Sequence, residues 1–215
     1  MEALRELVQQ KPYDRTSIAK LEEFVASAVK NEQYDFEIVK SLLKLYGVYP
    51  EEIKIDVVAN VLVLALMRLP STDFLNLACL VPHKLQKKEP LKSIFTCADH
   101  LDRCQFVEFW TARNAEGTSA LFGGVKGFDA AVRVFALSCV QATCRNISTE
   151  KLQAILGFTA AADFSGFIKG NSSIEQGAGA VISFAALPAS ATGNTTKQGH
   201  NVKYENVIRH MEMVQ

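Results

Sequence analysis

The most constraining feature of the sequence is a long apolar run in its first third. From Val57 to Met67 only Asn60 is polar, and Arg68 ends the run. This is well short of the roughly 20 residues that a helix needs to cross a bilayer, so a membrane span is not expected. A helix that is apolar on every side must be covered on every side by other elements. The run therefore predicts the enclosed, central helix of an α-helical domain.

The surrounding chain has the pattern of successive short helices as far as residue 145. Residues 17–30 and 35–47 carry apolar side chains at helical spacing, and Asp35 is an expected N-cap of the second helix. Turn signals recur at the distances typical of helix hairpins. We therefore expect a stacked-helix array over residues 1–145.

Aromatic residues and glycines mark the end of this array. Phe106, Phe109 and Trp110 stand at i, i+3 and i+4, which predicts one aromatic face turned toward the core. The glycine-bearing residues 117–127 are expected to form a loop, followed by a last long helix over 127–142.

The pattern changes after residue 145. Residues 147–157 and 161–170 predict two short helices, and residues 178–187, rich in β-branched and aromatic side chains, predict a strand. A polar loop separates this strand from residues 201–214, where a short strand and a closing helix are expected. The order of elements is that of a winged helix, so the sequence predicts a mainly α protein with a small α+β winged-helix domain over residues 146–215.

Charge and cysteine usage narrow the class of protein. Lys plus Arg and Asp plus Glu both number 23, so the formal net charge is zero and favours neither nucleic acid nor an anionic membrane as a partner. The 5 cysteines include no C-x-x-C pair and lie in apolar helical context, which indicates reduced core thiols. Without a signal-peptide pattern at the N-terminus, a cytoplasmic protein is expected.

Motifs that carry chemistry are weak in this sequence. His100 and Cys104 have the i, i+4 spacing of paired metal ligands, but a complete site needs further ligands, and a core thiol is the more plausible role of Cys104. The glycines of residues 123–127 precede a helix without matching a phosphate-binding motif. We therefore expect no cofactor, no metal and no enzyme activity.

The residues that we select as interaction candidates form three groups. The first is a possible strand edge and the second an apolar stripe for a partner helix. The third is a basic segment that would face RNA if the winged helix belonged to an RNA-binding factor, which is the alternative from a different functional class. The groups are Val181, Ile182 and Phe184; Val207, Ile208, Met211 and Met213; and Lys84, Lys87, Lys88 and Lys92.

Four blocks of the sequence resemble a known family when they are taken together. They are LEEFVASAVKNEQYDFEIVKSLLKLYGVYP, LMRLPSTDF, DRCQFVEFW and GFDAAVRVF, and they are spread over residues 15–137. In order and spacing they are similar to blocks of the k-subunit family of eukaryotic translation initiation factor 3. This family belongs to the PCI-type subunits, which occur in that initiation factor, in the proteasome lid and in the signalosome.

The resemblance implies a HEAT-like helical domain over residues 1–145, followed by a PCI-type winged helix over 146–215 with a C-terminal helix. It also implies a non-catalytic scaffold subunit of the initiation factor, contacting the l and e subunits and reaching the small ribosomal subunit through the complex. Direct contact of this chain with RNA does not follow from it. In this view residues 69–74, LPSTDF, form a structural joint between helices. A lid or signalosome subunit of similar architecture is the alternative within the same class.

Overall fold

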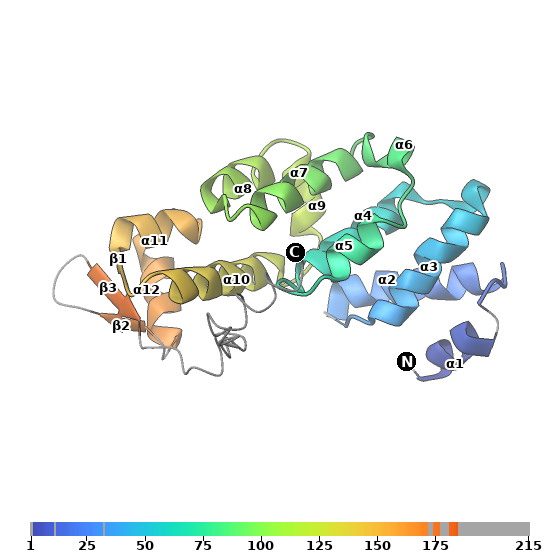
Figure 1. Ribbon diagram of the computed structural model, residues 1–215, viewed down its shortest axis with the longest axis horizontal. Coiled ribbons are helices and arrows are strands. Elements are labelled where there is room, and N and C mark those ends of the chain that lie inside the picture. The colour runs from blue at the N-terminus through green and yellow to red at the C-terminus, as the bar shows by residue number, and fades with distance from the viewer. Residues whose placement is uncertain (1, 11, 32, 172–173, 177–180, 185–215) are drawn as a thin grey trace, which may run out of the picture.

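The computed structural model describes residues 2–10, 12–31, 33–171, 174–176 and 181–184. Helices dominate these residues, and a small sheet is confined to the C-terminal part, which confirms the expected mainly α fold (Figure 1). In chain order the elements are α1 (Glu2–Gln10), α2 (Ser17–Asn31), α3 (Phe36–Val48), the 3-10 helix η1 (Pro50–Glu52), α4 (Ile55–Leu66), α5 (Asp73–Ala78), α6 (His83–Gln86), α7 (Leu91–Asp102), α8 (Phe106–Arg113), α9 (Thr118–Gly123), α10 (Phe128–Thr143), β1 (Asn146–Ser148), α11 (Thr149–Ile155), α12 (Ala161–Gly170), β2 (Ile174–Gln176) and β3 (Val181–Phe184).

Helix α4 is the centre of the helical stack, as its apolar sequence predicts. Every residue from Val61 to Leu66 is at most 2% exposed. The helix packs against α2, α5, α7, α9 and α10, so neighbours cover it on all sides. None of the helices in the described part of the chain has both the length and the apolarity to span a membrane.

Asp35 starts helix α3 in the way the sequence predicts. Its carboxylate accepts hydrogen bonds from the backbone N–H groups of Glu37 and Ile38, at 3.1 and 3.4 Å. These are two of the N–H groups that a helix start leaves without an intrahelical partner. The other carboxylate oxygen accepts from Nε of Arg5 at 2.5 Å, which ties α1 to α3 although Asp35 itself is only 4% exposed.

Residues 69–74 form the joint between α4 and α5 that the resemblance implies. The backbone N–H of Ser71 donates to the carbonyl of Arg68 at 2.8 Å, and the Ser71 hydroxyl donates to the Asp73 carboxylate at 2.7 Å. Phe74 then turns inward and is 8% exposed. The segment therefore connects the end of α4 to the start of α5.

The prediction of a loop over residues 117–127 is wrong, because this segment contains helix α9. Gly117 and Gly127 have positive φ, at 87° and 79°, and they stand directly before α9 and α10. Between them Phe122 is buried at 1% exposure and stacks on Phe128 at a centroid distance of 4.6 Å. Tertiary burial of one aromatic residue thus outweighs the poor helix propensity of the glycine-bearing segment.

The C-terminal elements have the winged-helix arrangement, with strands in other places than the sequence indicated. Strand β3 lies between β1 and β2, and both pairings are antiparallel. Strand β1 occupies residues 146–148, directly before helix α11, and neither β1 nor β2 at 174–176 was expected. Of the predicted strand over 178–187, β3 is the described part, and the strand and helix predicted over 201–214 lie outside the described residues.

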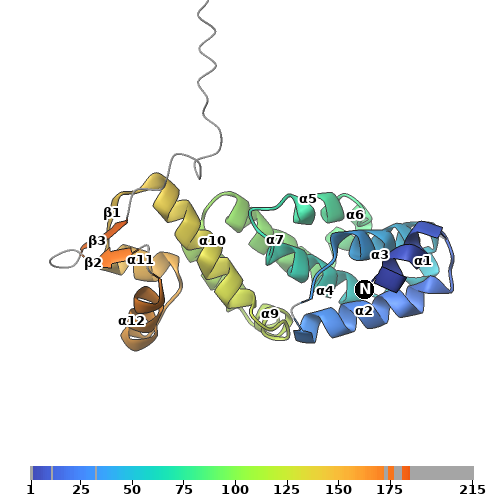
Figure 2. The ribbon, with the colours of Figure 1, turned by 90° about the horizontal axis from the view of Figure 1, so that it is seen from below.

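Helix α10 connects the helical stack to the C-terminal elements. Figure 2 shows it running from α9 at the stack to β1 and the sheet. Only Cys144 and Arg145 separate the end of α10 from β1. The division of the chain into two domains at residue 145 stays a prediction. The predicted boundary falls within this short connection.

Candidate interaction surfaces

The first candidate group was predicted to form a strand edge, and the order of strands in the sheet contradicts that prediction. Strand β3 pairs with β1 through residues 181–183 and with β2 through residues 182–184, so it is the central strand of the described sheet and not an edge strand. Alternation along the strand turns Ile182 and Phe184 inward, at 3% and 8% exposure, and leaves Val181 outward at 43%. A role of these residues in partner binding stays a prediction and would have to use the Val181 side chain.

The candidate apolar stripe of Val207, Ile208, Met211 and Met213 lies outside the described residues. Its role in binding a partner helix stays a prediction.

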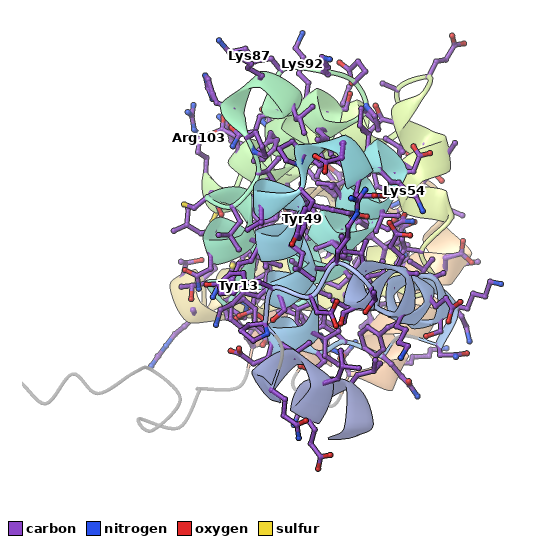
Figure 3. All side chains as sticks on the ribbon, turned by 90° about the vertical axis from the view of Figure 1, so that its right-hand side faces the viewer. Tyr13, Tyr49, Lys54, Lys87, Lys92 and Arg103 are labelled. Atoms are coloured by element: carbon purple, nitrogen blue, oxygen red, sulfur yellow. The ribbon has the colours of Figure 1, made fainter. Side chains whose placement is uncertain are left out.

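The basic segment lies on the surface at the beginning of α7. Lys84, Lys87, Lys88 and Lys92 are all exposed. Figure 3 shows Lys87 and Lys92 projecting outward from the same end of the molecule. None of the four forms an ion pair with another described residue, and the nearby Glu89 accepts a hydrogen bond from the Ser93 hydroxyl at 2.6 Å. The segment includes the short helix α6.

The His100 and Cys104 pair is not arranged as a ligand pair. Nδ1 of His100 lies 3.1 Å from the side-chain oxygen of Gln105, so this ring atom already has a polar partner. Cys104 sits in the turn between α7 and α8 with φ 56° and is exposed. Within the described ranges no group of three or more His, Cys, Asp or Glu side chains is placed to hold a metal ion.

The cysteines differ from the expectation of uniformly buried thiols. Only Cys97 is buried, and burial raises the pKa of its thiol to about 11. Cys139 and Cys144 are half-buried, and Cys79 and Cys104 are exposed. Cys97 and Cys139 lie within helices, whereas Cys79, Cys104 and Cys144 follow helix ends, so the expected helical context holds for only two of the five.

A pocket between α4 and α10 is the feature that the sequence did not indicate. Its volume is about 400 Å³, and its walls come from the chain before α3, the end of α4 and the first half of α10. The lining residues are Tyr34, Leu64, Met67, Arg68, Gly127, Ala130, Ala131 and Val134. No motif could have found it, because the three segments are far apart in the sequence.

The polar groups of this pocket are Tyr34 and Arg68. The guanidinium of Arg68 lies over the Tyr34 ring, 5.2 Å from its centroid, and forms no ion pair with a described residue. The Tyr34 hydroxyl is buried, and no described group meets it in hydrogen-bond geometry. The Asp73 carboxylate nevertheless acts on this hydroxyl. Burial first, and then the negative charge and the acceptor oxygen of Asp73, raise the pKa of Tyr34, so the hydroxyl keeps its proton at neutral pH.

The pocket wall on α10 is apolar and open to solvent. Gly127, Ala130, Ala131 and Val134 follow the i, i+3, i+4, i+7 spacing with which helices normally face a core. Here Ala130 is exposed and Val134 is 59% exposed. Helix α10 therefore has one apolar face that packs inward through Phe128 and Val132, and a second that the described chain leaves uncovered.

Comparison with known proteins gives results that agree with each other. Residues 52–191 match the CSN8/PSMD8/EIF3K family. The chain is also 31% identical over 195 residues to eukaryotic translation initiation factor 3 subunit K of Drosophila erecta, an alignment that covers 91% of this chain and 86% of the relative. The proteins of the same name from Drosophila yakuba and Drosophila sechellia are 30% and 31% identical over the same shares.

Proposed function

This chain belongs to the CSN8/PSMD8/EIF3K family, and from that premise we propose that it is a non-catalytic scaffold subunit of eukaryotic translation initiation factor 3. The observation that carries the proposal is the extent of the similarity to relatives named as subunit K. It covers 91% of the chain and so includes residues of both the helical stack and the winged helix. The relatives' name favours the initiation factor over a proteasome-lid or signalosome subunit of the same architecture.

The proposed mechanism is binding alone. Stacked helices give a rigid frame, and apolar side chains on its outside hold neighbouring subunits in register. Exposed apolar residues occur on several separate helices: Leu75 on α5 at 62%, Val107 on α8 at 50% and Val134 on α10 at 59% exposure. Single exposed apolar side chains are common in monomers, so the support comes from their occurrence on three separate helices.

The partners in this proposal are other subunits of the factor, the l and e subunits first, in the cytoplasm. The chain would reach the small ribosomal subunit through the complex and thereby contribute to its assembly during initiation. No membrane and no cofactor is part of the proposal.

Affinity purification tests the proposal directly. A tagged chain is purified from cytosolic extract at moderate salt, and the eluate is analysed by mass spectrometry and on a sucrose gradient. We expect stoichiometric recovery of other initiation factor 3 subunits and a fraction that migrates with small ribosomal subunits. Recovery of lid or signalosome subunits instead, or of the tagged chain alone, would contradict the proposal.

Direct RNA binding through the basic segment is the second candidate function. The four exposed lysines at residues 84, 87, 88 and 92 lack ion-pair partners among the described residues, which favours it. The test measures binding of the purified chain to single-stranded RNA as a function of salt. Replacing all four by Ala should reduce the slope of log K against log salt by about 3, since each phosphate contact to a single strand contributes about 0.7.

A matched control keeps the total charge change the same. Lys20, Lys44, Lys151 and Lys169 are exposed lysines on other helices, and replacing them by Ala should leave a specific RNA contact unchanged. Equal losses from both sets would mean that only general charge attraction operates, and that this second function is absent.

A further inference from the structure

We infer that the pocket between α4 and α10 receives a segment of a neighbouring subunit that carries a bulky apolar side chain next to a carboxylate. The inference rests on the proposed function, because it assumes that the chain works inside a complex. It goes further by naming the surface and the chemistry of the segment that binds there.

The shape of the pocket is suited to a side chain. Its volume of about 400 Å³ lies toward the small end of the roughly 300 to 1,000 Å³ typical of binding pockets. Leu64 forms its base at 2% exposure, and Met67 adds an adaptable thioether wall. Such a site gains free energy from burying one large apolar group, since its apolar walls are already in place.

The wall on α10 allows a backbone to come close. Gly127, Ala130 and Ala131 have small side chains or none, so a helix or extended segment can lie against α10 without a steric barrier. Val134, one turn further, is 59% exposed and would be covered by the same segment.

The polar groups select the charge of the occupant. Arg68 brings a guanidinium without an ion-pair partner among the described residues, and Tyr34 brings a buried, protonated hydroxyl on which the Asp73 carboxylate already acts. The Arg68 guanidinium is a charged donor, so the complementary group on the partner is an acceptor with negative charge, and a carboxylate fits it. Tyr and Arg are also the residues most enriched among those that dominate interface energies.

Substitutions at the pocket test the inference within the assembled complex. Ala130→Trp fills the pocket from an exposed position, and Arg68→Glu reverses the selecting charge. In competition with the wild-type chain for the purified partner subcomplex, each variant should bind about tenfold more weakly or worse, as expected for the loss of an interface anchor. The matched controls are Ala120→Trp on α9 and Arg103→Glu directly after α7, both exposed and outside the pocket, which should compete like the wild type.

Photo-crosslinking identifies the occupant. Benzoyl-phenylalanine at position 134 in the affinity-purified complex should crosslink to one subunit peptide that contains a bulky apolar residue beside Asp or Glu. The same group at Val107 on α8 should not crosslink to that peptide.

The outcomes separate this inference from the proposed function. If the wild-type chain recovers the complex but both pocket variants compete normally, the inference is wrong and the proposed function stands. A crosslink from position 134 only to a second copy of this chain, or to a peptide without an acidic residue, also overturns it. If the wild-type chain assembles with no subunit, both fail together. Melting temperatures and circular dichroism of each variant exclude a folding defect as the cause of weak binding.

Discussion

The indole Nε1 of Trp110 on α8 donates a hydrogen bond of 2.9 Å to the carbonyl oxygen of Ile155 at the end of α11. Arg133 on α10 adds to this contact between α8 and the end of α11, which we call the Trp110 joint. Its Nε donates to the carbonyl of Leu156 at 3.1 Å, and its guanidinium lies over the rings of Trp110 and Phe158. The helical stack and the winged helix are thus held together by backbone carbonyls of one part and side chains of the other.

Trp110→Phe should destabilise the protein by about 1 to 3 kcal/mol, because it keeps most of the ring but leaves the half-buried Ile155 carbonyl without its donor. Urea unfolding followed by circular dichroism measures the change. Tyr49→Phe is the comparison, since it removes a hydrogen bond to the Tyr13 carbonyl in an exposed place and should cost less than about 0.5 kcal/mol. Equal effects of the two changes would show that the indole hydrogen bond contributes nothing special.

Gly157→Ala should be strongly destabilising. Gly157 has φ +65°, and a methyl group there would lie 2.5 Å from Cε2 of Trp110, closer than any side-chain carbon tolerates. The strained backbone and the clash together are expected to cost about 2 kcal/mol or more.

The control for this change is Gly166→Ala in α12, where nothing lies within 4 Å of the added methyl group. This substitution should instead stabilise the protein by up to about 1 kcal/mol, through better helix propensity. Stabilisation at both positions would mean that Trp110 does not pack against Gly157 as described.

The sequence was sufficient for features that depend on local pattern. The apolar run predicted α4 as the buried centre, and the spacing of Phe106, Phe109 and Trp110 predicted their burial. Asp35 could be assigned as a cap because capping involves only the next three residues.

Features that depend on contacts between distant segments could not be predicted in this way. Helix α9 was missed because its glycines lower helix propensity, whereas its stability comes from Phe122 packing on Phe128. Strand β1 has three residues and no alternation long enough to recognise, and its pairing with β3 makes β3 the central strand. The α4–α10 pocket joins Tyr34, Arg68 and Val134, whose proximity no sequence spacing reveals.

Asp35→Ala should cost about 2 kcal/mol, since it removes both the cap of α3 and the ion pair with Arg5. Asp35→Asn should cost less, because its amide oxygen can still accept the N–H groups of Glu37 and Ile38. The free energy of unfolding is measured with denaturant for both variants, each with and without Arg5→Met. This double-mutant cycle separates the contribution of the cap from that of the ion pair. If Asn and Ala cost the same, the capping role is wrong.

Cys97 should be the slowest cysteine of the described residues to react with a thiol reagent. Its pKa is raised to about 11 by burial, so at pH 8 only about one molecule in a thousand carries the reactive thiolate. Cys79 and Cys104 are exposed and should be modified first. Mass spectrometry of peptides at increasing times of reaction with iodoacetamide gives the order, and early modification of Cys97 in folded protein would contradict it.

The same pKa shift predicts how stability depends on pH. The ordinary thiol value is 9.0, and the folded-state value is higher, so the buried protonated thiol stabilises the fold fully below about pH 8.5. This contribution is lost as pH rises toward 11, because the unfolded chain releases the proton more readily. The free energy of unfolding should therefore fall more steeply between pH 9 and 10.5 in the wild type than in Cys97→Ala, and parallel curves would exclude the effect.

The joint at Trp110 also predicts how the whole chain unfolds. The sequence contains a single tryptophan, Trp110, so tryptophan fluorescence reports on the contact between α8 and the end of α11. Circular dichroism reports mainly on the helices. If the joint couples the two predicted domains, both signals should follow one urea transition in the wild type. In Gly157→Ala the fluorescence change should come first, because the weakened joint opens before the stack unfolds. Separate transitions already in the wild type would mean that the domains unfold independently and that the joint contributes little to their coupling.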